Sequence, residues 1–194
     1  LTAAGAALAF STGRVLGANE RIRVGFIGLG NRGDQVLDAF LPHSDAQVVA
    51  ICDLYQPYLD FAAQKIGGQP KQFKDYRQLL DLKDIDAVVI NTPDHWHAAQ
   101  TVHACQTGKH VYVEKPSSVT IHEGRAMVTA ARAYGRKVQV GAQGRTGWGA
   151  YYTCRAIRNG IVGKVNRVTC WHYENPVGGD QPDASPPPEL DWDL

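Results

Sequence analysis

Three glycines and one aspartate have the types and spacing of a dinucleotide-binding site. Gly28, Gly30 and Gly33 form the pattern G-x-G-x-x-G, and Asp53 follows after about 20 residues. In such a site the first glycine turns the chain sharply. The second lets the backbone approach a pyrophosphate, and the third lets the next helix pack close to the sheet. The phosphates rest on N–H groups at the start of that helix. The candidate phosphate site is therefore Gly28, Gly30, Asn31, Arg32 and Gly33.

Asp53 decides which dinucleotide we expect. A carboxylate at this position accepts hydrogen bonds from the adenosine ribose hydroxyls, whereas a 2′-phosphate would meet its negative charge. The sequence therefore favours NAD over NADP. A coincidental glycine-rich turn is the alternative, but an apolar strand-like run precedes these glycines and a helix-like segment follows them.

The segments around these residues alternate between strand-like and helix-like patterns. Strands are predicted at 22–28, 46–52, 71–73, 87–91, 110–114 and 137–141, and the run at 46–52 is almost continuously apolar. Helices are predicted between and after them, at 34–41, 57–66, 76–82, 97–107, 122–134 and 151–159. Six strands joined by helices predict an α/β fold with a Rossmann-type doubly wound parallel sheet.

The two ends of the chain differ from this pattern. Residues 1–20 are small and apolar at first, as in the h-region of an export signal, with a cleavage point after Ala18. This stretch is too short to cross a bilayer as a helix, and a helix packed on the domain is the alternative. Residues 165–173 alternate as in a strand and predict the start of a second domain. We therefore divide the chain into a leader at 1–20, an NAD-binding domain at 21–145 and the start of an incomplete substrate domain at 146–194.

Composition excludes several classes of protein. The 194 residues carry 20 basic and 19 acidic side chains, and no basic stripe predicts a nucleic-acid partner. Four widely spaced cysteines without a C-x-x-C pair suit thiols better than a disulfide framework or a zinc site. No segment predicts insertion into a membrane.

Polar residues follow three of the predicted strands, where ligands bind in such sheets. These loops are 91–97, 114–116 and 143–145. Asp94, His95 and His97 could alternatively hold a metal, but a third strong ligand would have to come from far away. We therefore expect no metal site.

These loops resemble those of a known family. The glycine pattern, Thr92-Pro93-Asp94-His95-Trp96-His97 and Tyr112-Val113-Glu114-Lys115-Pro116 are similar to the glucose–fructose oxidoreductase, inositol dehydrogenase and MocA (Gfo/Idh/MocA) family. The resemblance runs from about residue 21 to the end. The leader resembles the tail of the twin-arginine export signals of one branch, and residues 187–194 resemble the early second domain of that branch. This implies a periplasmic protein, or otherwise a cytoplasmic one, and a chain truncated at both ends.

The resemblance also implies residue roles. Lys115 is the implied catalytic residue, reaching the nicotinamide ribose and the substrate hydroxyl, where an ammonium stabilises developing alkoxide character. Glu114 and Pro116 would hold that lysine in place. The implied cofactor contacts beyond the glycine loop and Asp53 are Thr92, Pro93, His95, His97, Glu114, Lys115 and Gln143, with Arg145 as a looser match. The resemblance implies that the second domain is an α+β domain with an open-faced sheet. The family adds an Asp and a His from that domain, to which no residue here can be matched.

Three functions follow from this resemblance. The first is an NAD-dependent oxidoreductase that transfers a hydride from a sugar or polyol hydroxyl. The second is an NAD-dependent glycosidase that uses a transient oxidation, and the third is a dinucleotide-binding chain without turnover. Members of the family often pair through the sheet of the second domain, so we expect a homo-oligomer.

Overall fold

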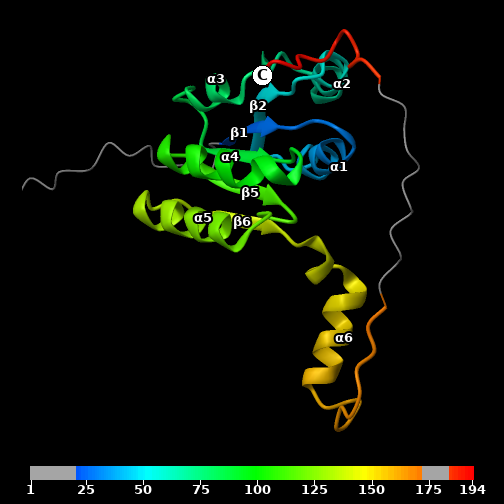
Figure 1. The fold of residues 1–194 in the computed structure, drawn as a ribbon. Coiled ribbons are helices and arrows are strands. Elements are labelled where there is room, and N and C mark those ends of the chain that lie inside the picture. Colours follow the sequence, from blue (N-terminus) through cyan, green and yellow to red (C-terminus); the bar gives the residue numbers. More distant parts are fainter. Residues whose placement is uncertain (1–20, 172–183) are drawn as a thin grey trace, which may run out of the picture.

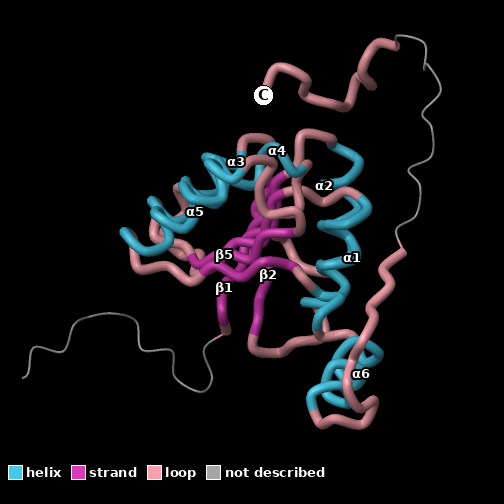
Figure 2. The backbone as a smooth tube through the Cα atoms, turned by 60° about the horizontal axis from the view of Figure 1, so that its bottom comes forward, coloured by secondary structure: helices cyan, strands magenta, loops and turns pink. Residues whose placement is uncertain are grey.

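The computed structural model describes residues 21–171 and 184–194, and its centre is a six-stranded parallel sheet (Figures 1 and 2). The strands lie in the order β3-β2-β1-β4-β5-β6, and every neighbouring pair is parallel. This confirms the predicted Rossmann-type sheet. The strands are β1 (Ile22–Ile27), β2 (Ala46–Cys52), β3 (Lys71–Phe73), β4 (Ala87–Ile90), β5 (His110–Glu114) and β6 (Val138–Gly141).

The chain changes direction across the sheet between β1 and β4. Strands β1, β2 and β3 are added toward one edge, whereas β4, β5 and β6 are added toward the other. The loops after β1 and β4 therefore leave the sheet in opposite directions and open a crevice between them. This crevice is where open α/β sheets bind their ligands.

Helices cover both faces of the sheet, as Figure 2 shows. The helices α1 (Asn31–Phe40) and α2 (Gln56–Ile66) pack on one face, and α3 (Tyr76–Leu80), α4 (Asp94–Gln106) and α5 (Ile121–Ala133) pack on the other. Successive strand residues point to opposite faces. Accordingly, Phe26 joins the core beneath α1 and α2, while Ile27 joins the core beneath α3 and α4. Because both faces are buried there, the central strands β1 and β4 read as apolar runs rather than as alternating patterns.

Helices α1 and α4 each begin three residues earlier than the sequence predicts, and both beginnings lie next to the crevice. Helix α1 starts at Asn31 rather than at residue 34, because Gly30 is already its extended N-cap. Helix α4 starts at Asp94 rather than at residue 97, directly after Pro93. Proline presets φ for a helix start, and an acidic first turn suits the positive end of the helix dipole.

The residues that follow β6 make little contact with the sheet. A short 3₁₀ helix at Gln143–Arg145 leads to α6 (Trp148–Arg158), which extends away from the sheet and has no buried residue (Figure 1). The strand predicted at 165–173 is wrong over residues 165–171, which form no strand. Alternation alone does not make a strand, because a strand needs a neighbour to complete its hydrogen bonds. Residues 172–173 and the predicted leader at 1–20 lie outside the described residues.

No helix in the described part of the chain is both long enough and apolar enough to span a membrane.

The glycine loop after β1 owes its shape to the absence of side chains. Gly28 has φ +86°, a conformation that L side chains rarely adopt, and a Cβ there would lie 2.7 Å from the backbone of Asn91 and Thr92. A Cβ on Gly33 would clash with the Gly28 carbonyl oxygen. The backbones of the loop and the first turn of α1 therefore touch directly.

The contact at Gly33 predicts a large cost for a small substitution. Gly33→Ala should lower the free energy of unfolding by about 1–3 kcal/mol, because overpacking forces the backbone of the loop to move. Gly68→Ala is the matched control, since nothing lies within 4 Å of a Cβ there, and its effect should stay within about 0.5 kcal/mol. Urea unfolding of both variants measures the difference. Equal stabilities would contradict the close contact.

Candidate functional site

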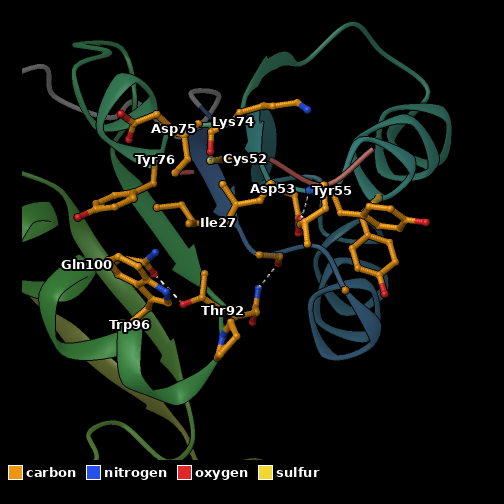
Figure 3. Close-up of a pocket in the computed structure, with 18 of the residues that line it drawn as sticks. Ile27, Cys52, Asp53, Tyr55, Lys74, Asp75, Tyr76, Thr92, Trp96 and Gln100 are labelled. Atoms are coloured by element: carbon orange, nitrogen blue, oxygen red, sulfur yellow. Dashed lines mark hydrogen bonds between the residues drawn. The ribbon is translucent and has the colours of Figure 1, made fainter. Parts of the chain in front are cut away.

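A cavity of about 760 Å³ opens at the carboxyl edge of the sheet, in the crevice between β1 and β4. This volume is within the range of small-molecule sites. In Figure 3, Asp53 and Tyr55 lie on one side of β1, and Tyr76, Trp96 and Gln100 lie on the other. The predicted cofactor residues Gly28, Gly30, Asn31, Arg32, Asp53, Thr92 and Pro93 all line this cavity.

The start of α1 supplies hydrogen-bond donors to the cavity. Gly30 is the N-cap with φ −63° and ψ −172°, and no side chain caps the helix. The N–H groups of a first helical turn have no partner within the helix, and the helix dipole adds partial positive charge there. Asn31 and Arg32 bring this turn to the wall of the cavity. The arrangement fits the phosphates of a dinucleotide.

Asp53 stands at the end of β2 with both carboxylate oxygens engaged. Oδ2 accepts a hydrogen bond from the Leu29 N–H at 2.7 Å, and Oδ1 accepts one from the Tyr55 N–H at 2.9 Å. Burial raises the pKa of Asp53, while the backbone hydrogen bonds act to lower it. The carboxylate thus fixes the glycine loop to β2, and it also lines the cavity at the place where a ribose is expected.

One buried polar atom of Asn91 has no partner. The side-chain Nδ2 donates to the Gly28 carbonyl oxygen at 3.5 Å, but Oδ1 has no hydrogen-bond partner in the described part of the chain. Asn91 lines the cavity, but this oxygen is itself buried and does not open to it. The uncapped start of α1 and the Asp53 carboxylate are therefore the features that fit a dinucleotide.

An ion pair joins the glycine loop side of the site to the Lys115 loop. The Arg32 guanidinium donates from Nε to Glu114 Oε1 at 2.8 Å, and its second nitrogen lies 2.7 Å from the same oxygen. The other carboxylate oxygen of Glu114 accepts from the Lys115 N–H at 2.9 Å. The Glu114 side chain is only 3% exposed. One buried carboxylate therefore fixes the backbone at Lys115 relative to the start of α1.

One group of predicted site residues lies outside the cavity lining, namely Glu114, Lys115, Gln143 and Arg145. Glu114 is buried beneath Arg32, and the Lys115 residue is exposed. Gln143 lies close to Arg32. With its amide turned so that the nitrogen donates to the Gly141 carbonyl oxygen, the amide oxygen accepts from the Arg32 guanidinium at 2.8 Å. Arg145 is exposed and lies two residues further along. Arg32 is thus the residue that connects the cavity to this group.

The two histidines of the loop after β4 have different surroundings. His95 is exposed at the start of α4, whereas His97 is 2% exposed. The His97 ring nitrogens lie 2.6 Å from the Pro116 carbonyl oxygen and 2.8 Å from that of Thr92. Because carbonyl oxygens only accept, both contacts are hydrogen bonds when both ring nitrogens carry protons. His97 therefore holds the β4 loop against the β5 loop and does not line the cavity.

The metal site considered as an alternative at Asp94, His95 and His97 requires three ligand side chains close together. Over residues 21–171 and 184–194, no group of three or more His, Cys, Asp or Glu side chains is close enough to hold a metal ion.

Sequence reasoning missed several aromatic and polar residues of the cavity. They are Tyr55, Tyr58, Lys74, Tyr76, Trp96 and Gln100. Tyr55 lies three residues after the end of β2 and Lys74 directly follows β3, so the rule that ligands bind at carboxyl edges could have found them. Trp96 belongs to the loop 91–97 that the sequence placed at this edge, although no contact was assigned to it. Tyr58, Tyr76 and Gln100 lie in helices, where nothing in the sequence separates a cavity residue from a core residue.

Comparison with known proteins gives one family. Residues 22–142 match the GFO_IDH_MocA family, described as an oxidoreductase family with an NAD-binding Rossmann fold. The chain is 32% identical over 154 residues to an alpha-N-acetylgalactosaminidase of Shewanella oneidensis, a match that covers 75% of this chain and 34% of the relative. The chain thus spans about a third of the length of the curated relatives it matches.

Solved structures give the same fold. A scyllo-inositol dehydrogenase from Lactobacillus casei with bound NAD(H) and scyllo-inositol superimposes with a TM-score of 0.70 at 27% identity, over 74% of this chain and 43% of that one. The WlbA dehydrogenase from Bordetella pertussis, in complex with NADH and UDP-GlcNAcA, gives a TM-score of 0.69 at 30% identity, over 74% and 44% of the two chains.

The ion pair between Arg32 and Glu114 predicts strong energetic coupling. Arg32→Ala should destabilise the fold by about 2–3 kcal/mol, because it leaves a buried carboxylate unpaired. This is below the cost for a fully buried pair, since the guanidinium side chain is 36% exposed. Glu114→Gln in the same background should restore part of the loss. A double-mutant cycle by urea unfolding should give about 1–3 kcal/mol of coupling.

The surface pair of Arg77 and Asp75 is the matched control for this cycle. Their atoms lie 3.1 Å apart and the Arg77 side chain is 55% exposed. The same cycle there should give less than about 1 kcal/mol. Similar coupling energies at the two pairs would show that burial of Glu114 does not strengthen its ion pair with Arg32.

Proposed function

The chain belongs to the family of oxidoreductases with an NAD-binding Rossmann fold, and on that premise we propose that it is the NAD-binding part of an enzyme that oxidises a sugar or polyol hydroxyl. One observation carries the proposal. The uncapped start of α1, the Asp53 carboxylate and the Lys115 backbone are linked at one edge of the sheet by hydrogen bonds and by the Arg32–Glu114 ion pair. The solved relatives with scyllo-inositol and with UDP-GlcNAcA support the substrate class.

Different residues of the chain would hold the cofactor and the substrate. NAD⁺, when bound, supplies the hydride acceptor. Asn31 and Arg32 would hold its phosphates, and Asp53 would accept from its adenosine ribose. Lys115 would bind the substrate hydroxyl and stabilise the negative charge that develops on its oxygen. Glu114 fixes the backbone at Lys115 through the N–H contact at 2.9 Å, which is how the ion pair with Arg32 would act on the reaction.

A second function has support from one comparison. The relative named alpha-N-acetylgalactosaminidase favours the alternative in which bound NAD⁺ would be reduced by the sugar and oxidised again within one turnover, while a glycosidic bond is broken. The two functions share the cofactor site and differ in products. Dinucleotide binding without turnover is the third possibility, because no residue of this chain could be matched to the family's acid–base pair.

Two further proposals rest on the sequence. We propose export to the periplasm from the composition of residues 1–18, and pairing of protomers through a second domain. Fractionation of cells that express the protein tests the first. Recovery of an uncleaved protein in the cytoplasm would count against it.

The Asp53 carboxylate predicts the choice of dinucleotide. The unaltered chain should bind NAD⁺ more tightly than NADP⁺, since the 2′-phosphate would meet the Asp53 charge. Asp53→Asn should weaken NAD⁺ binding about ten- to a hundredfold, as expected for the loss of a charged hydrogen-bond acceptor, and should narrow the difference between the two dinucleotides. Calorimetric titration measures both affinities.

Asp45→Asn is the control for this titration, because Asp45 is exposed and lies at the other end of β2. It should leave both affinities unchanged. Thermal unfolding of Asp53→Asn shows whether the loop is still held, since Asp53 also bonds Leu29 and Tyr55. A chain that prefers NADP⁺ would contradict the assignment.

Product stoichiometry tests the reaction. With NAD⁺ and an inositol or aldose, a dehydrogenase accumulates NADH, whereas with an aryl α-N-acetylgalactosaminide a glycosidase releases sugar without net NADH. Lys115→Ala should lower either rate by about 10²–10⁴-fold, as for loss of a group that handles a proton. Lys164→Ala, at an exposed lysine, is the control. Dinucleotide binding with neither product would support the third possibility.

A further inference from the structure

Residues 184–194 lie against the loop that follows β2. The N–H of Asp191 donates to the Leu54 carbonyl oxygen at 3.0 Å, and the N–H of Gln56 donates to the Glu189 carbonyl oxygen at 3.2 Å. Between these two bonds, Leu190 forms an antiparallel bridge with Tyr55. In Figure 1 this red segment runs beside the end of β2 and the start of α2. The segment is therefore held by its backbone, next to Asp53.

The segment turns its apolar side chains to the cavity. Pro187, Leu190 and Leu194 line it, whereas the acidic residues of the same segment do not. The Leu190 N–H donates to the Pro187 carbonyl oxygen at 3.0 Å and closes a turn. Pro187 and Leu190 both lie on the cavity side of this turn. An apolar wall suits a flat, weakly polar group such as a purine, and it would not suit phosphates.

We infer that residues 184–194 form the wall of the dinucleotide pocket that contacts the adenosine half of the cofactor, with Leu190 as its central side chain. The wall lies beside Asp53, the proposed ribose partner, and across the cavity from Trp96 and Gln100. The family match ends at residue 142, so this part of the pocket lies outside it. The inference rests on the proposed binding of NAD and adds residues that set its affinity.

The acidic residues give the wall a second property. Glu189, Asp191 and Asp193 lie in the same short segment as the apolar residues. Their charges disfavour an additional phosphate nearby, which is the same preference that Asp53 sets. The segment thus recognises an adenosine without a 2′-phosphate.

Two substitutions at Leu190 test the wall in the full chain. Leu190→Asp and the milder Leu190→Ala should raise the dissociation constant for NAD⁺ by about tenfold and about threefold, since apolar contact area is lost and, in the first, a charge is added. AMP, which holds only the adenosine half, should lose affinity by the same factors. Trp192→Ala is the matched control, because Trp192 is in the same segment but is 74% exposed and does not line the cavity.

Calorimetric titration with NAD⁺, and with AMP as competitor, separates the outcomes. Unchanged affinity in both Leu190 variants would overturn the inference while leaving the proposed function in place. Tighter binding would also overturn it, because the segment would then compete with the cofactor. A loss for NAD⁺ without a loss for AMP would overturn the assignment to the adenosine half. No binding to the unaltered chain would overturn the proposed function, and this inference with it.

Discussion

The site depends on one close contact between backbones, that of Gly28 with Gly33. A Cβ at Gly33 would clash with the Gly28 carbonyl oxygen, and a Cβ at Gly28 would clash with the backbone after β4. Without this contact α1 could not begin at Asn31, directly above the crevice between β1 and β4. The position of its free N–H groups, and of Arg32 in its first turn, follows from the absence of two side chains.

The polar groups around this contact tie separate loops to one another. Asp53 binds the glycine loop to the end of β2, Glu114 binds Arg32 to the Lys115 backbone, and His97 binds the loops after β4 and β5. Each connects segments that are distant in sequence. Buried polar groups with complete hydrogen bonding fix geometry more strongly than they stabilise the fold, so these residues define the site rather than the core.

The sequence predicted the sheet because buried parallel strands leave an unmistakable pattern of apolar runs. All six strands lie close to their predicted positions, although β3 has no apolar run, and the glycine spacing located the loop that lines the cavity. The helix starts at Asn31 and Asp94 were missed because caps are set by local backbone geometry. The role of His97 could not be predicted, since its partners are carbonyl oxygens, which every residue has. The strand at 165–173 failed over its described residues because alternation specifies a face but not a neighbour.

Stability and ligand binding are separable in this chain. The buried apolar residues that form the two cores all lie between Val24 and Ala130, on β1 to β5 and the helices around them. Residues 184–194 add no fully buried side chain, and Leu190 is only half-buried. Residues 184–194 are attached by backbone hydrogen bonds to the loop after β2. These bonds do not depend on the side chain, so a substitution in the segment leaves them in place. A change at Leu190 should therefore act on the pocket without weakening the sheet, so the affinity for the cofactor can vary while the scaffold that positions Asp53 stays intact.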